Sequence, residues 1–274
     1  MPISTEKNFE EKFNLFKEWL TQQDNFTSKD MIITANESSL ASGFSNETFI
    51  FNIKEKNISK NYVLRLKPTN YQVFPEYNLK LQVDIMRCLH KKGLPAPNVI
   101  LYESNDDILG SEFYLMNFIN GEAPSDNPPY HMDPEGMVGK AVKENRRKIW
   151  TEWIHYLNKI HILNIDDLGL TELDIKYKKN DPIDIDISYY QNFLDWGMDG
   201  EDNPLCDDVL NWLRENKPKK HNALSLCWGD SRPGNILYQD FKATALLDWE
   251  MATYGDPISD IAWGLAVDDA SSIG

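Results

Sequence analysis

The chain is 274 residues long, and its 43 acidic and 28 basic side chains give a formal charge of −15, which argues against non-specific binding to nucleic acid or to anionic membranes. A hydrophobic content of 41% is that of a soluble globular protein, and three cysteines without a CxxC pair exclude a disulfide scaffold and a cysteine zinc site. Because the sequence shows neither an 18-residue apolar run nor a signal peptide, we expect a cytoplasmic protein with no membrane partner.

The pattern of residues 1–119 predicts a small, β-rich lobe. Apolar positions spaced by three and four indicate two amphipathic helices, at residues 6–22 and 76–92. The expected strands are short segments rich in β-branched and aromatic residues, at 31–35, 47–53, 62–66, 98–102 and 112–119. In the second of them, Phe49, Phe51 and Ile53 alternate on one face.

Residues 120–274 predict a larger, mainly helical lobe, separated from the first by a proline-rich hinge at 123–134. The expected helices and short strands of this lobe lie at 146–163, 187–196 and 206–215, and at 224–228, 236–238 and 244–247. Alternation of isoleucine and aspartate over residues 183–187 favours a solvated, extended edge. The expected fold class is α+β with two lobes, an arrangement that usually places the ligand in the cleft between them.

Three oxygen-bearing side chains follow apolar strands in the second lobe. Asp230 ends one strand, Asn235 comes five residues later after a tight loop, and Asp248 ends the third strand. Oxygen donors from one asparagine and one aspartate suit Mg²⁺, and the remaining aspartate is free to accept a proton from an attacking hydroxyl group. A D-x-x-x-x-N motif followed by an apolar strand and another aspartate is the arrangement that kinases use for phosphoryl transfer.

These segments resemble the aminoglycoside phosphotransferase and choline kinase superfamily, whose fold is similar to that of protein kinases. In its pattern of residues, the chain most resembles the phosphotransferase domains associated with acyl-CoA dehydrogenases. The family's H-G-D-x-x-x-x-N is written here as residues 228–235, with Trp228 in place of histidine. Its I-D-W-E corresponds to residues 247–250 and its G-D-P-x-x-D-[LI]-A to 255–262. The resemblance covers about residues 30–270.

On the catalytic side, the resemblance implies that Asp230 is the catalytic base and that Asn235 and Asp248 bind Mg²⁺. Asp260, at the start of a helix, is expected to cap the helix or brace a loop rather than to catalyse.

On the nucleotide side, the resemblance implies that Arg65 binds the phosphates of ATP and pairs with Glu76, which would open the helix at 76–92; Lys67 is the alternative cation. Met116 would lie behind adenine, with backbone groups of Asn117 and Ile119 hydrogen-bonded to its edge. The loop over the phosphates would consist of Ser42, Gly43, Phe44, Ser45 and Asn46.

The resemblance therefore implies an ATP- and Mg²⁺-dependent kinase that phosphorylates a hydroxyl group of a small molecule, with a hydroxyacyl-CoA as the first candidate acceptor. An aminoglycoside or an amino alcohol such as choline is the alternative within this class, and the charge of −15 suits cationic acceptors. A nucleotide-binding pseudokinase without turnover is the alternative from another class. It is favoured by Trp228 and by the end of the chain at Gly274, which suggests truncation within the helices that line the acceptor site in relatives. The sequence does not indicate an oligomeric state.

Overall fold

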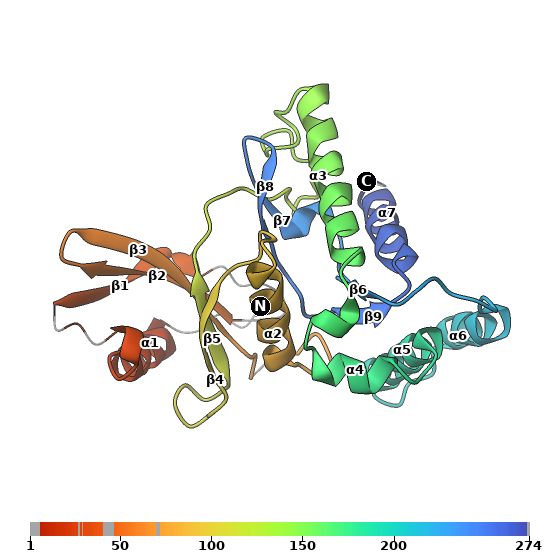
Figure 1. Cartoon of the computed structure of the whole chain (residues 1–274), viewed down its shortest axis with the longest axis horizontal. Coiled ribbons are helices and arrows are strands. Elements are labelled where there is room, and N and C mark those ends of the chain that lie inside the picture. The colour runs from red at the N-terminus through yellow and green to blue at the C-terminus, as the bar shows by residue number, and fades with distance from the viewer. Residues whose placement is uncertain (1–5, 27, 29, 41–46, 70–71, 273–274) are drawn as a thin grey trace. The chain divides into compact units, whose positions relative to one another are not determined.

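The short apolar strands of the first half of the chain pair into one antiparallel sheet in the computed structural model, which describes residues 6–26, 28, 30–40, 47–69 and 72–272. The strand order is β1-β2-β3-β5-β4 (Figure 1). The bounds of these strands are β1 Met31–Leu40, β2 Glu47–Glu55, β3 Ile58–Leu66, β4 Val99–Glu103 and β5 Phe113–Asn117. Each strand expected from the first half of the sequence is therefore present.

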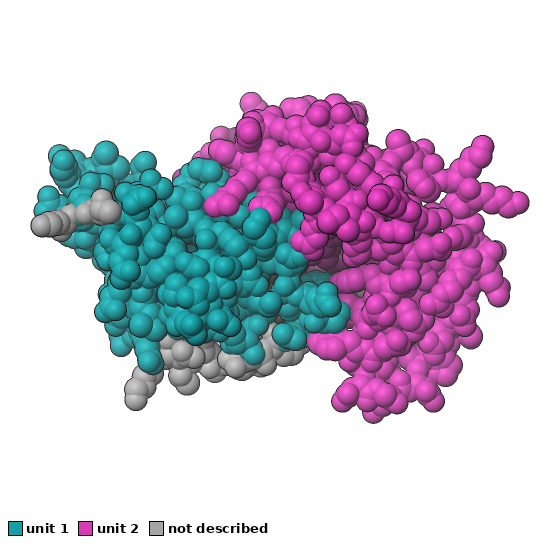
Figure 2. Space-filling model, turned by 60° about the horizontal axis from the view of Figure 1, so that its bottom comes forward, with its two compact units in different colours: residues 1–83, 98–118 teal, residues 84–97, 119–274 magenta. Residues whose placement is uncertain are grey.

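The chain divides into two units, which Figure 2 colours separately. The first unit comprises residues 1–83 and 98–118, and the second comprises 84–97 and 119–274. The division near residue 118 falls one residue before the end of the expected first lobe. Residues 84–97 group with the second unit, in which Leu246 N donates a 2.7 Å hydrogen bond to Pro95 O.

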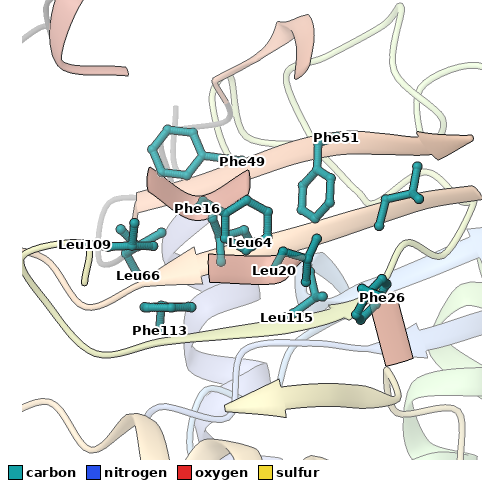
Figure 3. Packing of buried hydrophobic residues seen from close by; sticks show 11 residues of the cluster. Phe16, Leu20, Phe26, Phe49, Phe51, Leu64, Leu66, Leu109, Phe113 and Leu115 are labelled. Atoms are coloured by element: carbon teal, nitrogen blue, oxygen red, sulfur yellow. The ribbon is translucent and has the colours of Figure 1, made fainter. Parts of the chain in front are cut away.

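An aromatic core fills the space between α1 (Glu6–Leu20) and the sheet of the first unit (Figure 3). Phe16 of α1 meets Phe51 of β2 edge to face, with ring centroids 4.9 Å apart. The expected alternation in β2 is confirmed, since Phe49, Phe51 and Ile53 are all buried. Burial of several large aromatic rings stabilises a domain by kilocalories per mole for each ring, and this packing fixes the positions of β3 and β5.

The second unit combines helices with two pairs of short strands. Its helices include α3 Lys143–His161, α4 Thr171–Tyr177, α5 Pro182–Met198, α6 Pro204–Asn216 and α7 Ile258–Ser272, and α2 Leu79–Lys91 enters it from the first unit. The strands are β6 Ser225–Cys227, β7 Ile236–Gln239, β8 Lys242–Leu246 and β9 Thr253–Gly255, paired as β6–β9 and β7–β8. No helix in the described part of the chain has both the length and the apolar character needed to cross a bilayer.

The expected extended edge at residues 183–187 is wrong, because these residues lie in α5. The Asp181 side chain accepts a 2.9 Å hydrogen bond from Ile183 N, and Pro182 occupies the first helical position. An aspartate N-cap followed by proline is a strong signal for the start of a helix. Here this local signal outweighs a short alternation of apolar residues.

The start of α2 also differs from expectation, since the helix begins at Leu79 rather than at Glu76. The Asn78 side chain accepts a 2.9 Å hydrogen bond from Leu81 N, which caps the first turn. Glu76 therefore lies before the helix, where it is exposed.

Candidate active site

Three donors fix the side chain of Asp230, which lies between β6 and the short 3₁₀ turn at Pro233–Asn235. Trp263 Nε1 of α7 donates to Oδ1 at 2.7 Å, and Asn235 Nδ2 donates to Oδ2 at 2.7 Å. Arg232 Nε lies 3.2 and 3.1 Å from the two oxygens. The side chain is 17% exposed, so this carboxylate is fixed in orientation but is still reached by solvent.

The β7–β8 hairpin brings Asn235 and Asp248 to the same end. Ile236 pairs with Leu246, and the pairing continues with a 2.9 Å hydrogen bond from Leu247 N to Asn235 O. Asp248 is the next residue along the chain, and one of its carboxylate oxygens is buried. Asp230, Asn235 and Asp248, which are separated in sequence, therefore meet at one end of this hairpin.

The amide of Asn235 has a defined orientation. Its Nδ2 donates both to Asp230 O at 2.8 Å and to the Asp230 carboxylate, and the side chain is 7% exposed. Because both bonds use the nitrogen, the amide oxygen is the atom left to bind a cation. An amide oxygen beside the carboxylate of Asp248 is a donor set of the kind that Mg²⁺ prefers.

Trp228, which stands where the family motif has histidine, braces this end of the hairpin. Its ring is fully buried and stacks on Trp249, with centroids 5.1 Å apart and planes 19° from parallel. Its Nε1 donates to Leu247 O at 2.8 Å and to Asp248 O at 3.1 Å. The indole thus joins the segment before Asp230 directly to the segment that carries Asp248.

Asp260 of α7 holds the backbone on the other side of Trp228. Its two carboxylate oxygens accept hydrogen bonds from Trp228 N and Gly229 N, each at 2.8 Å, and His161 Nε2 lies 2.8 Å from Oδ2. The side chain is 1% exposed. The interpretation of Asp260 as a loop brace is confirmed by these contacts.

Comparison with known proteins identifies the family. The chain matches the phosphotransferase enzyme family over residues 37–273. It belongs to this family. It is 30% identical over 225 residues to acyl-CoA dehydrogenase family member 11 of Rattus norvegicus, and the match covers 81% of this chain but 26% of that protein. The chain therefore spans about a quarter of the length of the curated relatives it matches.

The fold of this chain is similar to that of solved phosphotransferase structures. A Plasmodium vivax ethanolamine kinase is similar with a TM-score of 0.61 at 15% identity, over 99% of this chain and 72% of that one. The ternary complex of the phosphotransferase APH(2'')-IIa with streptomycin and ATP gives a TM-score of 0.56 at 15% identity, over 92% of this chain and 78% of that one. The expected kinase-like α+β fold is confirmed.

In the first unit of this phosphotransferase-family chain, β3 and β5 carry the residues expected to bind nucleotide. Arg65 lies on β3 opposite Tyr114 of β5, and its Nε is buried. Lys67 follows the end of β3, and its Nζ forms a 3.2 Å ion pair with Glu112. Arg65 remains our candidate for the phosphate-binding cation, with Lys67 as the alternative.

The expected adenine-binding strand is β5. Met116 is buried there, between Val63 of β3 and Val99 of β4. Asn117 N donates a 3.1 Å hydrogen bond to Asn98 O, so a contact between Asn117 and adenine would have to use another of its atoms. Ile119 is the first residue of the second unit after β5. The expected phosphate loop, residues 42–46, lies outside the described residues.

Arg232 is a site residue that our sequence analysis did not single out. Its guanidinium joins Asp230 to Asp126, with Nη2 3.0 Å from Asp126 Oδ2 and a second contact from Nη1 to Asp126 Oδ1. Burial lowers the pKa of Arg232, but the hydrogen bonds and charges of Asp126 and Asp230 outweigh burial and raise this pKa above its ordinary value. Arg232 therefore stays positively charged beside the candidate base.

Helix α5 contributes an acidic group that the sequence placed on a solvated edge. Burial raises the pKa of Asp186 to about 6, and the charge of Lys176 opposes this rise only in part. Partial burial raises the pKa of Tyr190, and the charges of Asp186 and Asp230 add to that effect. Asp186 and Tyr190 thus share an electrostatic environment with the candidate base.

We expect replacement of Asp260 by asparagine to destabilise the protein by about 1–3 kcal/mol. One of the two buried backbone N–H groups would face an amide nitrogen, and a buried donor without an acceptor costs about 1–3 kcal/mol. Urea unfolding followed by circular dichroism measures the loss. Asp269→Asn, at an exposed position of the same helix, is the control and should change stability by less than about 0.5 kcal/mol. Equal stability of the two variants would contradict the brace.

The raised pKa of Asp186 predicts a pH-dependent stability difference. The folded protein holds this proton to about pH 6, whereas the unfolded chain releases it near pH 3.9. Stability contributed by Asp186 therefore falls as the pH rises from about 4 to 6. The stability of Asp186→Asn relative to wild type should grow across this interval by on the order of 2 kcal/mol, as measured by urea unfolding at each pH. Asp195→Asn, on the exposed side of α5, should give a flat difference; a flat difference for Asp186→Asn would refute the assigned burial.

Proposed function

We propose that this chain is an ATP- and Mg²⁺-dependent kinase that transfers the γ-phosphoryl group to a hydroxyl group of a small molecule. The observation that carries the proposal is the meeting of Asp230, Asn235 and Asp248 at one end of the β7–β8 hairpin. Membership of the phosphotransferase enzyme family supports the reaction class. The ATP in the complex of APH(2'')-IIa supports the phosphoryl donor.

In this proposal Asp230 accepts the proton of the attacking hydroxyl group. Trp263 and Arg232 hold the carboxylate from one side and Asn235 holds it from the other, so that it does not need to reorient during the reaction. A base positioned in this way typically contributes about 10²–10⁴-fold to the rate.

Asn235 and Asp248 would hold Mg²⁺ through the amide oxygen and the carboxylate. Both are hard oxygen donors, and the buried oxygen of Asp248 and the oriented amide of Asn235 fit this cation. The bound cation supplies charge neutralisation at the phosphate oxygens. Arg65 on β3 would bind the same phosphates, and Met116 on β5 would lie against adenine.

For the acceptor we propose a hydroxyacyl-CoA, since the curated relatives are members of the acyl-CoA dehydrogenase family. A cationic amino alcohol is the second candidate. It is favoured by the fold similarity to an ethanolamine kinase and by the net charge of −15.

An ADP-release assay tests the proposed function. The purified chain is incubated with Mg-ATP and, in separate reactions, with 3-hydroxyoctanoyl-CoA, ethanolamine and streptomycin. We expect ADP release to rise with the CoA thioester and to be absent in Asp230→Asn. Stabilisation of the protein by Mg-ATP without ADP release in any reaction would instead support the pseudokinase alternative. If Mg-ATP neither stabilises the protein nor yields ADP in any of the reactions, the proposal is overturned.

A further inference from the structure

A cavity of about 490 Å³ lies within the second unit, beside the loop that carries Asp230, and none of Asp230, Asn235 and Asp248 lines it. Its walls come from the segment 124–139, from the first turns of α3 and from Pro233 of the loop that carries Asp230. The volume is that of a site for a small organic ligand. None of the functional residues assigned above explains why such a space is present.

The wall formed by the segment 124–139 is tied to two other parts of the unit. His131 Nε2 lies 2.7 Å from Asp268 of α7, and the Tyr130 hydroxyl group donates to the same carboxylate. Asp126 is paired with Arg232. These contacts hold the segment against α7 and against the loop after Asp230, so the chain's own side chains fix this wall of the cavity.

A cation lines the cavity in a fixed position. Arg146 is an exposed residue of the lining; its Nε donates to Ala141 O at 3.0 Å and its Nη2 donates to Gly139 O at 3.3 Å, and these two hydrogen bonds hold the guanidinium. The lining carboxylate, Asp133, accepts from the backbone N–H groups of Glu135 and Gly136.

The stretch of chain that carries Arg146 is basic, in contrast to the whole protein. Five of the nine residues from 140 to 148 are lysine or arginine and one is acidic, whereas the chain carries a net charge of −15. Lys140 is paired with Glu135 at 3.2 Å, and the lining itself holds one cation, Arg146, and one carboxylate, Asp133. The basic stretch beside the cavity favours the approach of an anion to Arg146.

Much of the remaining lining is apolar or aromatic. Val138 and Ile149 contribute side chains without polar groups, and Trp150 contributes a flat ring, so that this part of the wall can cover an alkyl chain or a ring. Ile149 is also held from behind, because its carbonyl accepts a 3.3 Å hydrogen bond from the Tyr238 hydroxyl group. One cationic end and an apolar wall together define the ligand.

We propose that this cavity binds an organic anion with an apolar part, through Arg146 at the anionic end and through Val138, Ile149 and Trp150 along the apolar part. Pro233 lies in the wall and also in the loop between Asp230 and Asn235. The ligand therefore borders the loop that carries the candidate base. Resting on the proposed function, this inference gives the class of the acceptor: an amphipathic anion, not a cationic amine.

Isothermal titration calorimetry without nucleotide tests the cavity, with octyl phosphate as the probe. We expect octyl phosphate to bind at least about 10-fold more tightly than 1-octanol, which lacks the charge, and than inorganic phosphate, which lacks the chain. Arg146→Gln should weaken the binding of octyl phosphate by about 10–100-fold, which is the effect of losing a hydrogen bond to a charged group. Lys148→Gln removes the same charge at an exposed position two residues away and should weaken it by less than about 3-fold.

Val138→Phe adds volume to the cavity wall without a change of charge, and it should also weaken the binding of octyl phosphate. The inference would be overturned if Arg146→Gln and Lys148→Gln lost the same affinity for octyl phosphate, if 1-octanol bound as tightly as octyl phosphate, or if octyl phosphate did not bind.

The thermal shift given by Mg-ATP separates this inference from the proposed function. If Mg-ATP stabilises the protein and octyl phosphate does not bind, the cavity assignment alone fails. If octyl phosphate binds as expected and Mg-ATP gives no shift, the kinase proposal fails and the anion site stands.

Discussion

Replacing Asp248 by asparagine should lower phosphoryl transfer by about 10³-fold and remove the Mg²⁺ dependence of ATP binding. A metal ion contributes several kilocalories per mole of charge stabilisation in such reactions, and 4 kcal/mol corresponds to about 10³-fold in rate. Turnover is measured by ADP release with the acceptor found in the screen. Binding is measured separately, by titration with ATP in the presence and absence of Mg²⁺.

The hairpin provides a matched control for this variant in Asp240. Both aspartates have a positive φ, 62° at Asp248 and 52° at Asp240, and both lie at ends of the same β7–β8 hairpin. Asparagine tolerates this left-handed conformation as well as aspartate does. Asp240→Asn should therefore keep wild-type turnover. Equal activity of the two variants would contradict the assignment of Asp248.

Replacing Gly229 by alanine should destabilise the protein by about 2–5 kcal/mol. The residue has φ of +87°, and an added Cβ would lie 2.1 Å from the carbonyl oxygen of Met251. The left-handed conformation costs a non-glycine residue about 1–2 kcal/mol, and a clash with backbone adds about 1–3 kcal/mol. Urea unfolding measures the loss in stability.

Gly200 separates the two parts of this cost. Its φ of +88° is almost the same, but an added Cβ would meet nothing within 4 Å. Gly200→Ala should therefore lose only the conformational part, about 1–2 kcal/mol. If both alanine variants lost the same stability, close packing of the loop before Asp230 against Met251 would be refuted.

The strands and the reacting side chains could be predicted because their signals are local. The alternation in β2 marks its buried face, and Asp230, Asn235 and Asp248 stand at fixed distances from apolar strands along a short stretch of chain. A tight hairpin converts these sequence distances into spatial proximity. Nothing outside the stretch is needed to place the three residues near one another.

Other parts of the site depend on contacts between residues far apart in the sequence. Trp263 reaches Asp230 from a helix 33 residues later, and Asp126 reaches Arg232 over 106 residues. The motif at residues 255–262 was visible in the sequence, but Trp263, which follows it, could not be assigned a partner from spacing alone. For Asp186 the Asp-Pro capping signal at 181–182 was available in the sequence, and it would have placed this residue on a helix.

The most direct test of the central claim is a calorimetric titration with ATP, with and without Mg²⁺, of wild type, Asp230→Asn, Asn235→Ala and Asp248→Asn. If Asn235 and Asp248 hold the cation and Asp230 acts on the acceptor, Mg²⁺ should tighten ATP binding at least about 10-fold in wild type and Asp230→Asn. This gain should be lost in the other two variants. ATP affinity that is independent of Mg²⁺ in wild type, or retention of the full gain in Asp248→Asn, would contradict the account.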